Sequence, residues 1–335
     1  MRHWLERRWY SHEPPPSWLL PLSSLFAAVA QARRRRLEPL ARSAPVPVIV
    51  VGNLAVGGTG KTPFVIWLVE RLREWGLRPG VISRGYGGHA PRYPWRVSGR
   101  TPVTEAGDEP LLIALRTAAP VMVGPDRVAT ACALAQQAEI DVLVSDDGLQ
   151  HYRLARALEI CVIDGRRGLG NGALLPAGPL REAPSRLHEV GLVVINGEGY
   201  DAGHAAQLTM DLRSVDAVPL AGGAALRLDR LRGQRVHAVA GIGNPDRFFD
   251  SLRARGIEVI AHPFRDHHAY TGQDIQFLDG LTVLMTEKDA VKCRSFAGPV
   301  HYAVPVHAHV DDAGTALVQA LVQQSLALPA AATPR

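Results

Sequence analysis

The chain has 335 residues, of which 47% are hydrophobic and 21% charged, a composition that excludes a disordered chain, a coiled coil and a polytopic membrane protein. The formal net charge is +5, and residues 1–42 carry the whole excess, so we expect no nucleic-acid partner, which would need basic residues across a folded face. The three cysteines lie far apart without a C-x-x-C spacing, which favours a reducing, cytosolic compartment over a disulfide scaffold or zinc module.

Residues 1–42 form a basic N-terminal segment that contains an apolar stretch. The stretch covers residues 17–30, Pro21 interrupts it, and four arginines follow at 33–36. It is shorter than the roughly 20 residues that span a bilayer, and a signal peptide carries its charges before the apolar region. We therefore expect an amphipathic helix on a membrane surface, with the arginines against anionic phosphates. A buried terminal helix with a solvated basic end is the alternative.

Residues 43–212 alternate short apolar runs with helical patterns. Helices are expected at 62–75 and 126–138. Strands are expected at 48–51, 80–83, 121–123, 142–145, 160–163 and 192–195. This alternation predicts an α/β fold with a doubly wound, mostly parallel sheet of the P-loop NTPase kind.

The pattern loosens over residues 213–235, which we interpret as a linker. A second alternation over 236–328 predicts a smaller C-terminal α/β domain, and residues 329–335 form a tail. Its expected elements are strands at 236–240, 257–261, 282–286 and 302–306 and helices at 245–254 and 311–326.

A glycine-rich loop, GNLAVGGTGKTP over residues 52–63, joins the first expected strand to the first expected helix. Its glycines allow backbone N–H groups to turn around phosphate oxygens. Lys61 is placed to reach the β- and γ-phosphates of a nucleotide, and the Thr62 hydroxyl to bind Mg²⁺. The strict G-x-x-x-x-G-K-[ST] pattern fails at Ala55, which is a mild departure. The predicted nucleotide-binding residues are Leu54, Ala55, Val56, Gly57, Gly58, Thr59, Gly60, Lys61 and Thr62.

An apolar strand that ends in two acids completes the predicted nucleotide site. DVLVSDD occupies residues 141–147, so Asp146 and Asp147 lie at the carboxyl end of a strand, where open α/β sheets bind ligands. Two carboxylates near a phosphate loop indicate a nucleoside triphosphate site with a divalent metal. A polar turn at the end of a strand is the alternative interpretation.

Seven motifs in order carry a family resemblance that covers nearly the whole chain, from about Trp4 to Val306. They are the phosphate loop, SRGYGG (83–88), GDEP (107–110), SDDGLQH (145–151), GNGALLPAGPLRE (170–182), FRDHHAYT (264–271) and TEKDAVK (286–292). In these motifs the chain resembles the tetraacyldisaccharide 4'-kinase family. The resemblance implies transfer of the ATP γ-phosphate to the 4'-hydroxyl of a tetraacyldisaccharide 1-phosphate in lipid A biosynthesis, with lipid IVA as product. It also implies a peripheral or monotopic location on the cytoplasmic face of the bacterial inner membrane, with no obligate protein partner.

Phosphoryl transfer requires charge neutralisation, in-line positioning and an acceptor for the hydroxyl proton. Lys61 and Mg²⁺ supply the first, and Asp108 of the GDEP motif is the leading candidate for the last. The family pattern F-x-D-H maps onto residues 264–267, which implies that His267 holds or tunes Asp108. His268 follows directly and is the alternative partner. A zinc site in this turn is a weaker interpretation, because its crowded histidines lack the usual ligand spacing.

Two further sets of residues complete the expected site. The metal set is Thr62, Asp146, Asp147 and Glu182. The substrate set is Arg84, Tyr86, Glu109, Gln150 and His151. Ordinary ion pairs are the alternative for Arg84 and Glu182. Two other functions remain open on the same residues: a membrane-associated P-loop ATPase switch that phosphorylates no substrate, and a different small-molecule P-loop kinase or ligase.

Overall fold

The β-branched apolar runs of the first domain form a nine-stranded sheet in the computed structural model, which describes residues 2–11 and 13–327. The strand order is β15-β8-β7-β6-β1-β5-β2-β4-β3. The strands from β8 to β4 are parallel, and β15 and β3 pair antiparallel at the two edges. Their bounds are β1 Val48–Gly52, β2 Pro79–Ser83, β3 Trp95–Val97, β4 Val121–Val123, β5 Val142–Asp146, β6 Leu158–Asp164, β7 Leu192–Asn196, β8 Gln207–Arg213 and β15 His307–Val310.

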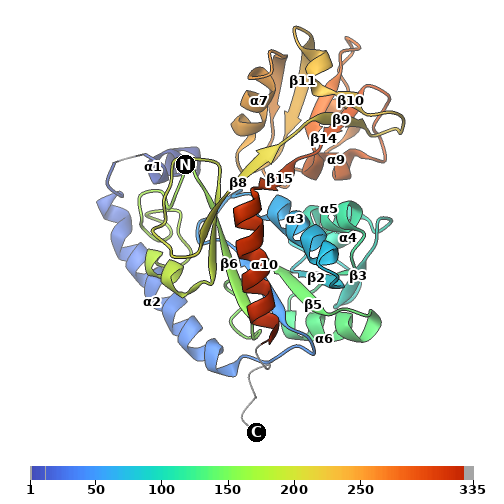
Figure 1. The fold of residues 1–335 in the computed structure, drawn as a ribbon. Coiled ribbons are helices and arrows are strands. Elements are labelled where there is room, and N and C mark those ends of the chain that lie inside the picture. The colour runs from blue at the N-terminus through green and yellow to red at the C-terminus, as the bar shows by residue number, and fades with distance from the viewer. Residues whose placement is uncertain (1, 12, 328–335) are drawn as a thin grey trace.

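Helices cover both faces of this sheet, which confirms the predicted doubly wound fold (Figure 1). On one face, Phe64 and Leu72 of α3 share a core with Ile113 of α5 and Val318 of α10. On the other face, Leu134 of α6 packs in a second core. The helices are α3 Lys61–Glu74, α4 Val103–Ala106, α5 Asp108–Thr117, α6 Arg127–Gln137, α10 Asp312–Ala327 and the 3-10 helix η3 Pro184–Glu189.

The second domain has a six-stranded sheet in the order β10-β9-β14-β13-β11-β12. The four strands from β14 to β12 are parallel, and β9 and β10 continue the sheet antiparallel. Its elements are β9 Asp216–Pro219, β10 Leu226–Arg227, η4 Leu228–Leu231, β11 Arg235–Ala240, α7 Pro245–Arg253, β12 Glu258–Pro263, α8 Gly272–Ile275, β13 Val283–Thr286, α9 Glu287–Cys293 and β14 His301–Val304.

Two predicted domain boundaries are wrong. Residues 213–235, expected as a linker, contain β9, β10 and η4, which belong to the second domain. The chain then returns to the first domain after β14, because β15 pairs with β8 and α10 packs beside α3 (Figure 1). His307 of β15 lies opposite Arg213 of β8. The two crossings between the domains therefore lie side by side.

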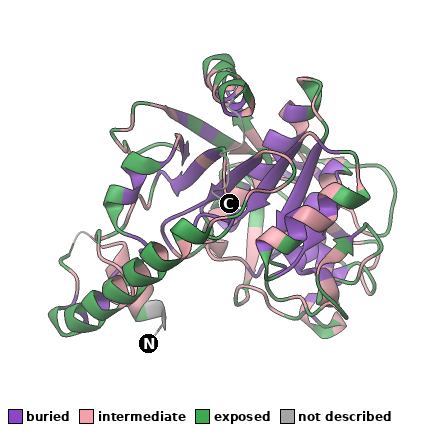
Figure 2. Cartoon of the chain, turned by 90° about the horizontal axis from the view of Figure 1, so that it is seen from below, coloured by how far each residue is buried: buried purple, intermediate pink, exposed green. Residues whose placement is uncertain are grey.

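The N-terminal segment consists of α1 Arg2–Trp9, η1 Ser17–Leu19, α2 Leu20–Leu37 and η2 Glu38–Leu40. It lies against the first domain, where the buried Ser23 hydroxyl donates to the carbonyl oxygen of Leu174 at 2.8 Å. Most of the remaining surface of α2 is exposed (Figure 2). Within residues 2–11 and 13–327, no helix has the length and apolar character required to cross a membrane.

Candidate active site

The glycine-rich loop lies between β1 and α3 at the carboxyl edge of the first sheet. Gly60, the N-cap of α3, has a φ of 94°. A Cβ at this position would lie 2.4 Å from Asn196 Nδ2, which donates to the carbonyl oxygen of Thr59 at 2.9 Å. Glycine is therefore required for both backbone conformation and packing. Ala55, where the strict pattern has glycine, is buried and bridges to Leu180, so the loop accommodates its methyl group.

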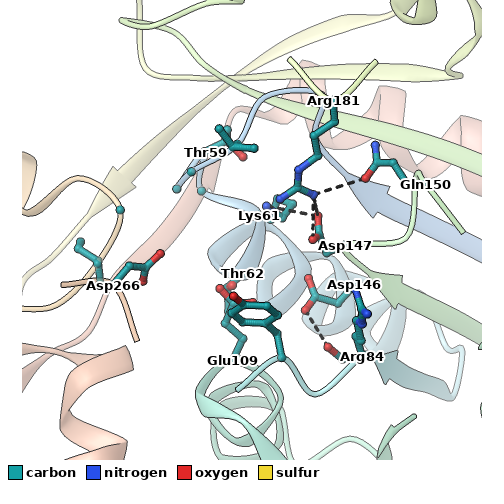
Figure 3. A pocket seen from close by; sticks show the side chains of 18 of the residues that line it. Thr59, Lys61, Thr62, Arg84, Glu109, Asp146, Asp147, Gln150, Arg181 and Asp266 are labelled. Atoms are coloured by element: carbon teal, nitrogen blue, oxygen red, sulfur yellow. Dashed lines mark hydrogen bonds and ion pairs between the residues drawn. The ribbon is translucent and has the colours of Figure 1, made fainter. Parts of the chain in front are cut away.

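Asp147 follows β5 and lies beside the lysine of the loop (Figure 3). Its carboxylate is 3.5 Å from Lys61 Nζ and 3.2 Å from Arg181 Nη1. Burial by itself raises the pKa of Asp147, but Lys61 and Arg181 lower it by more, so the pKa lies below its ordinary value. The ionised Asp147 therefore holds Lys61 at the start of α3, where a helix of 14 residues directs its N-terminal N–H groups toward the loop.

Asp146, the last residue of β5, has one satisfied and one unsatisfied carboxylate oxygen. It is 1% exposed, and its Oδ2 accepts a hydrogen bond from Ser83 Oγ at 3.3 Å. Its Oδ1 is buried and has no hydrogen-bond partner among the described residues. Burial, followed by the charges of Glu109 and Asp147, raises the pKa of Asp146 to about 7. A buried carboxylate oxygen without a hydrogen-bond partner fits a bound cation, which would pair with the oxygen and favour the ionised form of Asp146.

The two domains meet at Asp108 and His267, and the contact predicted between them is present. Asp108 begins α5 and is 4% exposed, and its Oδ2 lies 2.9 Å from His267 Nδ1. Burial raises the pKa of Asp108, but the hydrogen bond to His267 and the charges of Lys288 and Lys292 bring it below its ordinary value. The same hydrogen bond raises the pKa of His267. The pair therefore favours a carboxylate beside a protonated imidazole.

His268, the alternative partner, lies elsewhere. Its Nε2 is 3.4 Å from Asp274 Oδ2, and its ring packs on Phe264 and Tyr270 with centroids 4.7 Å and 4.8 Å apart. His267 instead takes a left-handed backbone with a φ of 58°, and its ring lies 4.9 Å from that of Tyr86. The turn thus directs two consecutive histidines to different sites.

One cavity of about 1610 Å³ unites the phosphate loop, the acid pair and the interdomain contact. At one end it is lined by the loop from Val56 to Thr62, by Asp146 and Asp147, and by His267. Helices α1 and α2 contribute another, mostly apolar part of the lining, which also contains Glu6 and Arg33. Its apolar residues include Leu5, Trp9, Phe26, Val29 and Leu37. The predicted substrate residues all line the cavity: Arg84, Tyr86, Glu109, Gln150 and His151.

Four predicted residues do not line this cavity. One is Asp108, which is 4% exposed and contacts the cavity-lining His267. Leu54 and Ala55 are buried beneath the loop and support it. Glu182 is 6% exposed, accepts a hydrogen bond from Gln150 Nε2 at 2.6 Å and pairs with Arg186 Nε at 3.4 Å. Its carboxylate therefore contacts Gln150 and Arg186, which agrees with the ion-pair alternative, and its place in the metal set stays a prediction.

Sequence reasoning missed Arg127, which lines the cavity and is 3% exposed. It donates to the carbonyl oxygens of Gly124 at 3.0 Å and Asp146 at 3.1 Å. Burial lowers its pKa to about 10, so the guanidinium stays charged. His151, also in the cavity, has its pKa lowered to about 4 by burial and by the nearby arginines, so its imidazole is neutral. The position of Arg127, at the start of a helix that follows a parallel strand, was the available signal.

Comparisons with known proteins identify a family. The family model described as Tetraacyldisaccharide-1-P 4'-kinase (LpxK) matches residues 16–325. The chain is 52% identical over 301 residues to the tetraacyldisaccharide 4'-kinase of Stutzerimonas stutzeri, covering 88% of this chain and 89% of that protein. It is 53% identical over 311 residues to that of Stenotrophomonas maltophilia, covering 90% and 91%.

A solved structure is also similar. LpxK from Aquifex aeolicus, crystallised in complex with ATP, superposes with a TM-score of 0.77 at 29% sequence identity, and the match covers 92% of this chain and 99% of that one. The match therefore extends over both domains. On these similarities, the chain belongs to the tetraacyldisaccharide-1-P 4'-kinase family.

Proposed function

We propose that this chain transfers the γ-phosphoryl group of ATP to the 4'-hydroxyl of a tetraacyldisaccharide 1-phosphate. The observation that carries the proposal is the 2.9 Å contact between Asp108 and His267. This contact comes from two domains and borders a cavity whose other walls are a phosphate loop and an apolar surface. An enzyme that phosphorylates the head of a lipid needs these three features in one place.

The residues supply each requirement of phosphoryl transfer. The loop N–H groups and Lys61 bind the phosphates and neutralise the charge that develops on the transferred group. The Asp108 carboxylate, held by His267, accepts the proton of the attacking hydroxyl, whose oxygen forms the new bond to phosphorus as the bond to ADP breaks. Arg84, Arg127 and His151 provide donors for the phosphate and hydroxyl groups of the sugar head.

We further propose that Mg²⁺ accompanies ATP. Thr62 and Asp146 would hold it, with Asp147 beside them, and the unsatisfied Asp146 Oδ1 supports this choice. In the described part of the chain, no three His, Cys, Asp or Glu side chains gather as a metal site. The nucleotide phosphates must then provide the other ligands. When bound, the ion would neutralise phosphate charge.

The outer face of α2 supports a membrane-surface location. Trp18, Leu22, Leu25 and Val29 follow at spacings of three or four residues and are 64%, 53%, 62% and 59% exposed. We term these four side chains the apolar stripe: Trp18 comes from η1, and Leu22, Leu25 and Val29 share one face of α2. Trp4 stacks on Trp18 with ring centroids 6.5 Å apart. Because Val29 also lines the cavity, acyl chains could enter from the lipid along this helix.

The basic run beside the stripe has two kinds of contact. Arg33 donates to the carbonyl oxygen of Gln150 at 3.2 Å, and Arg34 pairs with Glu38 and Glu189. These two hold α2 against the first domain, contrary to the expectation that all four arginines face lipid. Arg35 and Arg36 are exposed and remain for anionic phosphates. We propose that the protein is located on the cytoplasmic face of the bacterial inner membrane. Its three free cysteines agree with a reducing compartment.

One experiment tests the activity directly. The full chain is incubated with ATP, Mg²⁺ and the disaccharide 1-phosphate in mixed vesicles, and the lipid is examined by mass spectrometry. We expect the lipid to gain one phosphoryl group, located on the 4'-hydroxyl by fragmentation. ADP formation without a phosphorylated lipid would instead indicate an ATPase switch, and phosphorylation of another acceptor alone would indicate a different kinase.

A further inference from the structure

Helix α9 of the second domain carries two lysines one turn apart, and both reach toward Asp108 of the first domain. Lys288 Nζ lies 3.1 Å from Glu109 Oε1, 3.2 Å from Asp266 Oδ1 and 4.0 Å from Asp108 Oδ2. Lys292 Nζ lies 3.8 Å from Asp108 Oδ2. The pair of acids at the start of α5 therefore faces two ammonium groups from the opposite domain.

The two lysines have different partners. Lys292 forms a 2.8 Å ion pair with Asp289, which is fully buried and accepts hydrogen bonds from Thr286 and from the backbone of Gly241. Its charge thus balances an acid inside the second domain. Lys288 instead lies among three carboxylates from both domains, those of Asp108, Glu109 and Asp266.

Asp266 directly precedes His267, and Glu109 directly follows Asp108. Asp266 approaches the cavity from the second domain and Glu109 from the first (Figure 3). Without a cation between them, bringing His267 to Asp108 would bring like charges together in a poorly solvated place. The Lys288 side chain is 16% exposed, so its attraction to these acids is only partly screened.

We propose that Lys288 is a positioning residue for the phosphoryl-transfer step, which keeps Asp108 ionised and aligned with His267 as the two domains meet. This inference rests on the proposed kinase function. The groups that face Asp108 are His267, Lys288 and Lys292, with Glu109 and Asp266 at their edge. Of these, Lys288 alone contacts both Glu109 of the first domain and Asp266 of the second in the described contacts.

A neighbouring ion pair provides a matched control. Arg116 of α5 pairs with Glu287 of α9 at 2.6 Å, so it joins the same two helices across the same interface. None of its described contacts reaches Asp108 or His267. If Lys288 merely held the domains together, Lys288→Met and Arg116→Met would have similar effects.

The experiment compares Lys288→Met, Lys288→Arg and Arg116→Met with the unaltered full chain. We expect Lys288→Met to lower kcat about 10- to 100-fold while the KM for ATP changes less than about threefold. The acidic limb of the plot of kcat against pH should move to higher pH for this variant, because loss of the Lys288 ammonium group favours protonated Asp108. Lys288→Arg should restore most of kcat, and Arg116→Met should leave the acidic limb in place. If Lys288→Met does not fold by circular dichroism, Lys288→Gln takes its place under the same criteria.

A second readout separates this inference from the proposed function. The ¹³C carboxyl signal of Asp108, assigned with Asp108→Asn, is titrated in each variant without substrate. We expect an upward shift of its pKa in Lys288→Met and none in Arg116→Met. An unmoved pKa or a normal kcat profile in Lys288→Met would overturn the positioning role in an active kinase. Absence of lipid phosphorylation by the unaltered chain would reject the kinase function, whatever the titration shows.

Discussion

The loop after β11 places Gly243 of the second domain directly against the phosphate loop of the first. A Cβ on Gly243 would lie 2.9 Å from the backbone N of Gly58, closer than such atoms approach in proteins. The backbone at Gly243 is outside the left-handed region, so alanine itself is not strained there. Gly243→Ala must therefore move the two loops apart by a few tenths of an ångström.

The size of the effect follows from where this contact forms. Overpacking a close contact costs about 1–3 kcal/mol. Because Gly243 and Gly58 belong to different domains, the cost falls on the arrangement that also brings His267 to Asp108. We expect kcat/KM for lipid phosphorylation to fall by about 5- to 150-fold, since 1.4 kcal/mol corresponds to about tenfold.

The assay is steady-state phosphorylation of the disaccharide lipid, with the thermal unfolding midpoint measured for each protein. Gly298→Ala is the matched control, because it lies in the same domain and the nearest atom to its Cβ would be 3.7 Å away. We expect its kinetics and Tm to equal those of the unaltered chain. A Gly243→Ala enzyme with unaltered kcat/KM would refute the close approach of the two loops during turnover.

Three other predictions concern the interdomain pair and the apolar stripe. Asp108→Ala and His267→Ala should each lower kcat by about 100-fold or more with little change in ATP affinity. Because the two residues act as a unit, the double variant should lose less activation free energy than the two single losses added together, and additive losses would contradict this. The stability gained from the pair should be largest between the ordinary pKa values of 3.8 for Asp108 and 6.5 for His267. This stability should be lost as pH rises through the raised pKa of His267 or falls through the lowered pKa of Asp108. His267→Asn should therefore lower Tm more at about pH 5.5 than at about pH 9, and an equal loss of Tm at both pH values would count against an ionised pair. Leu25→Glu should weaken binding to anionic vesicles about tenfold, measured by vesicle sedimentation. Leu278→Glu, at a fully exposed leucine of the second domain, should leave this binding unchanged. Equal sedimentation of both variants would exclude the apolar stripe as the membrane contact.

The phosphate loop and the acid pair could be predicted from sequence because both depend on neighbouring residues. A glycine-rich turn between a strand and a helix is determined by consecutive backbone conformations, and Gly60 takes a left-handed form that glycine adopts readily. Asp146 ends its strand as predicted, since a β-branched run stops at its first charged residue. The pairing of His267 with Asp108 had a different origin, because spacing alone did not distinguish His267 from His268 and the family resemblance made the choice.

Tertiary structure decided the features that depend on contacts between distant residues. Asp108 and His267 are 159 residues apart, and a left-handed turn determines which histidine faces the acid. Only the fold shows that the Glu182 carboxylate contacts Gln150 and Arg186. No strand was predicted at β15, His307–Val310, whose pairing with β8 returns the chain to the first domain. Local pattern determines whether a segment forms a strand or a helix, whereas its partner depends on which surface buries the most apolar area, and that is a property of the whole fold.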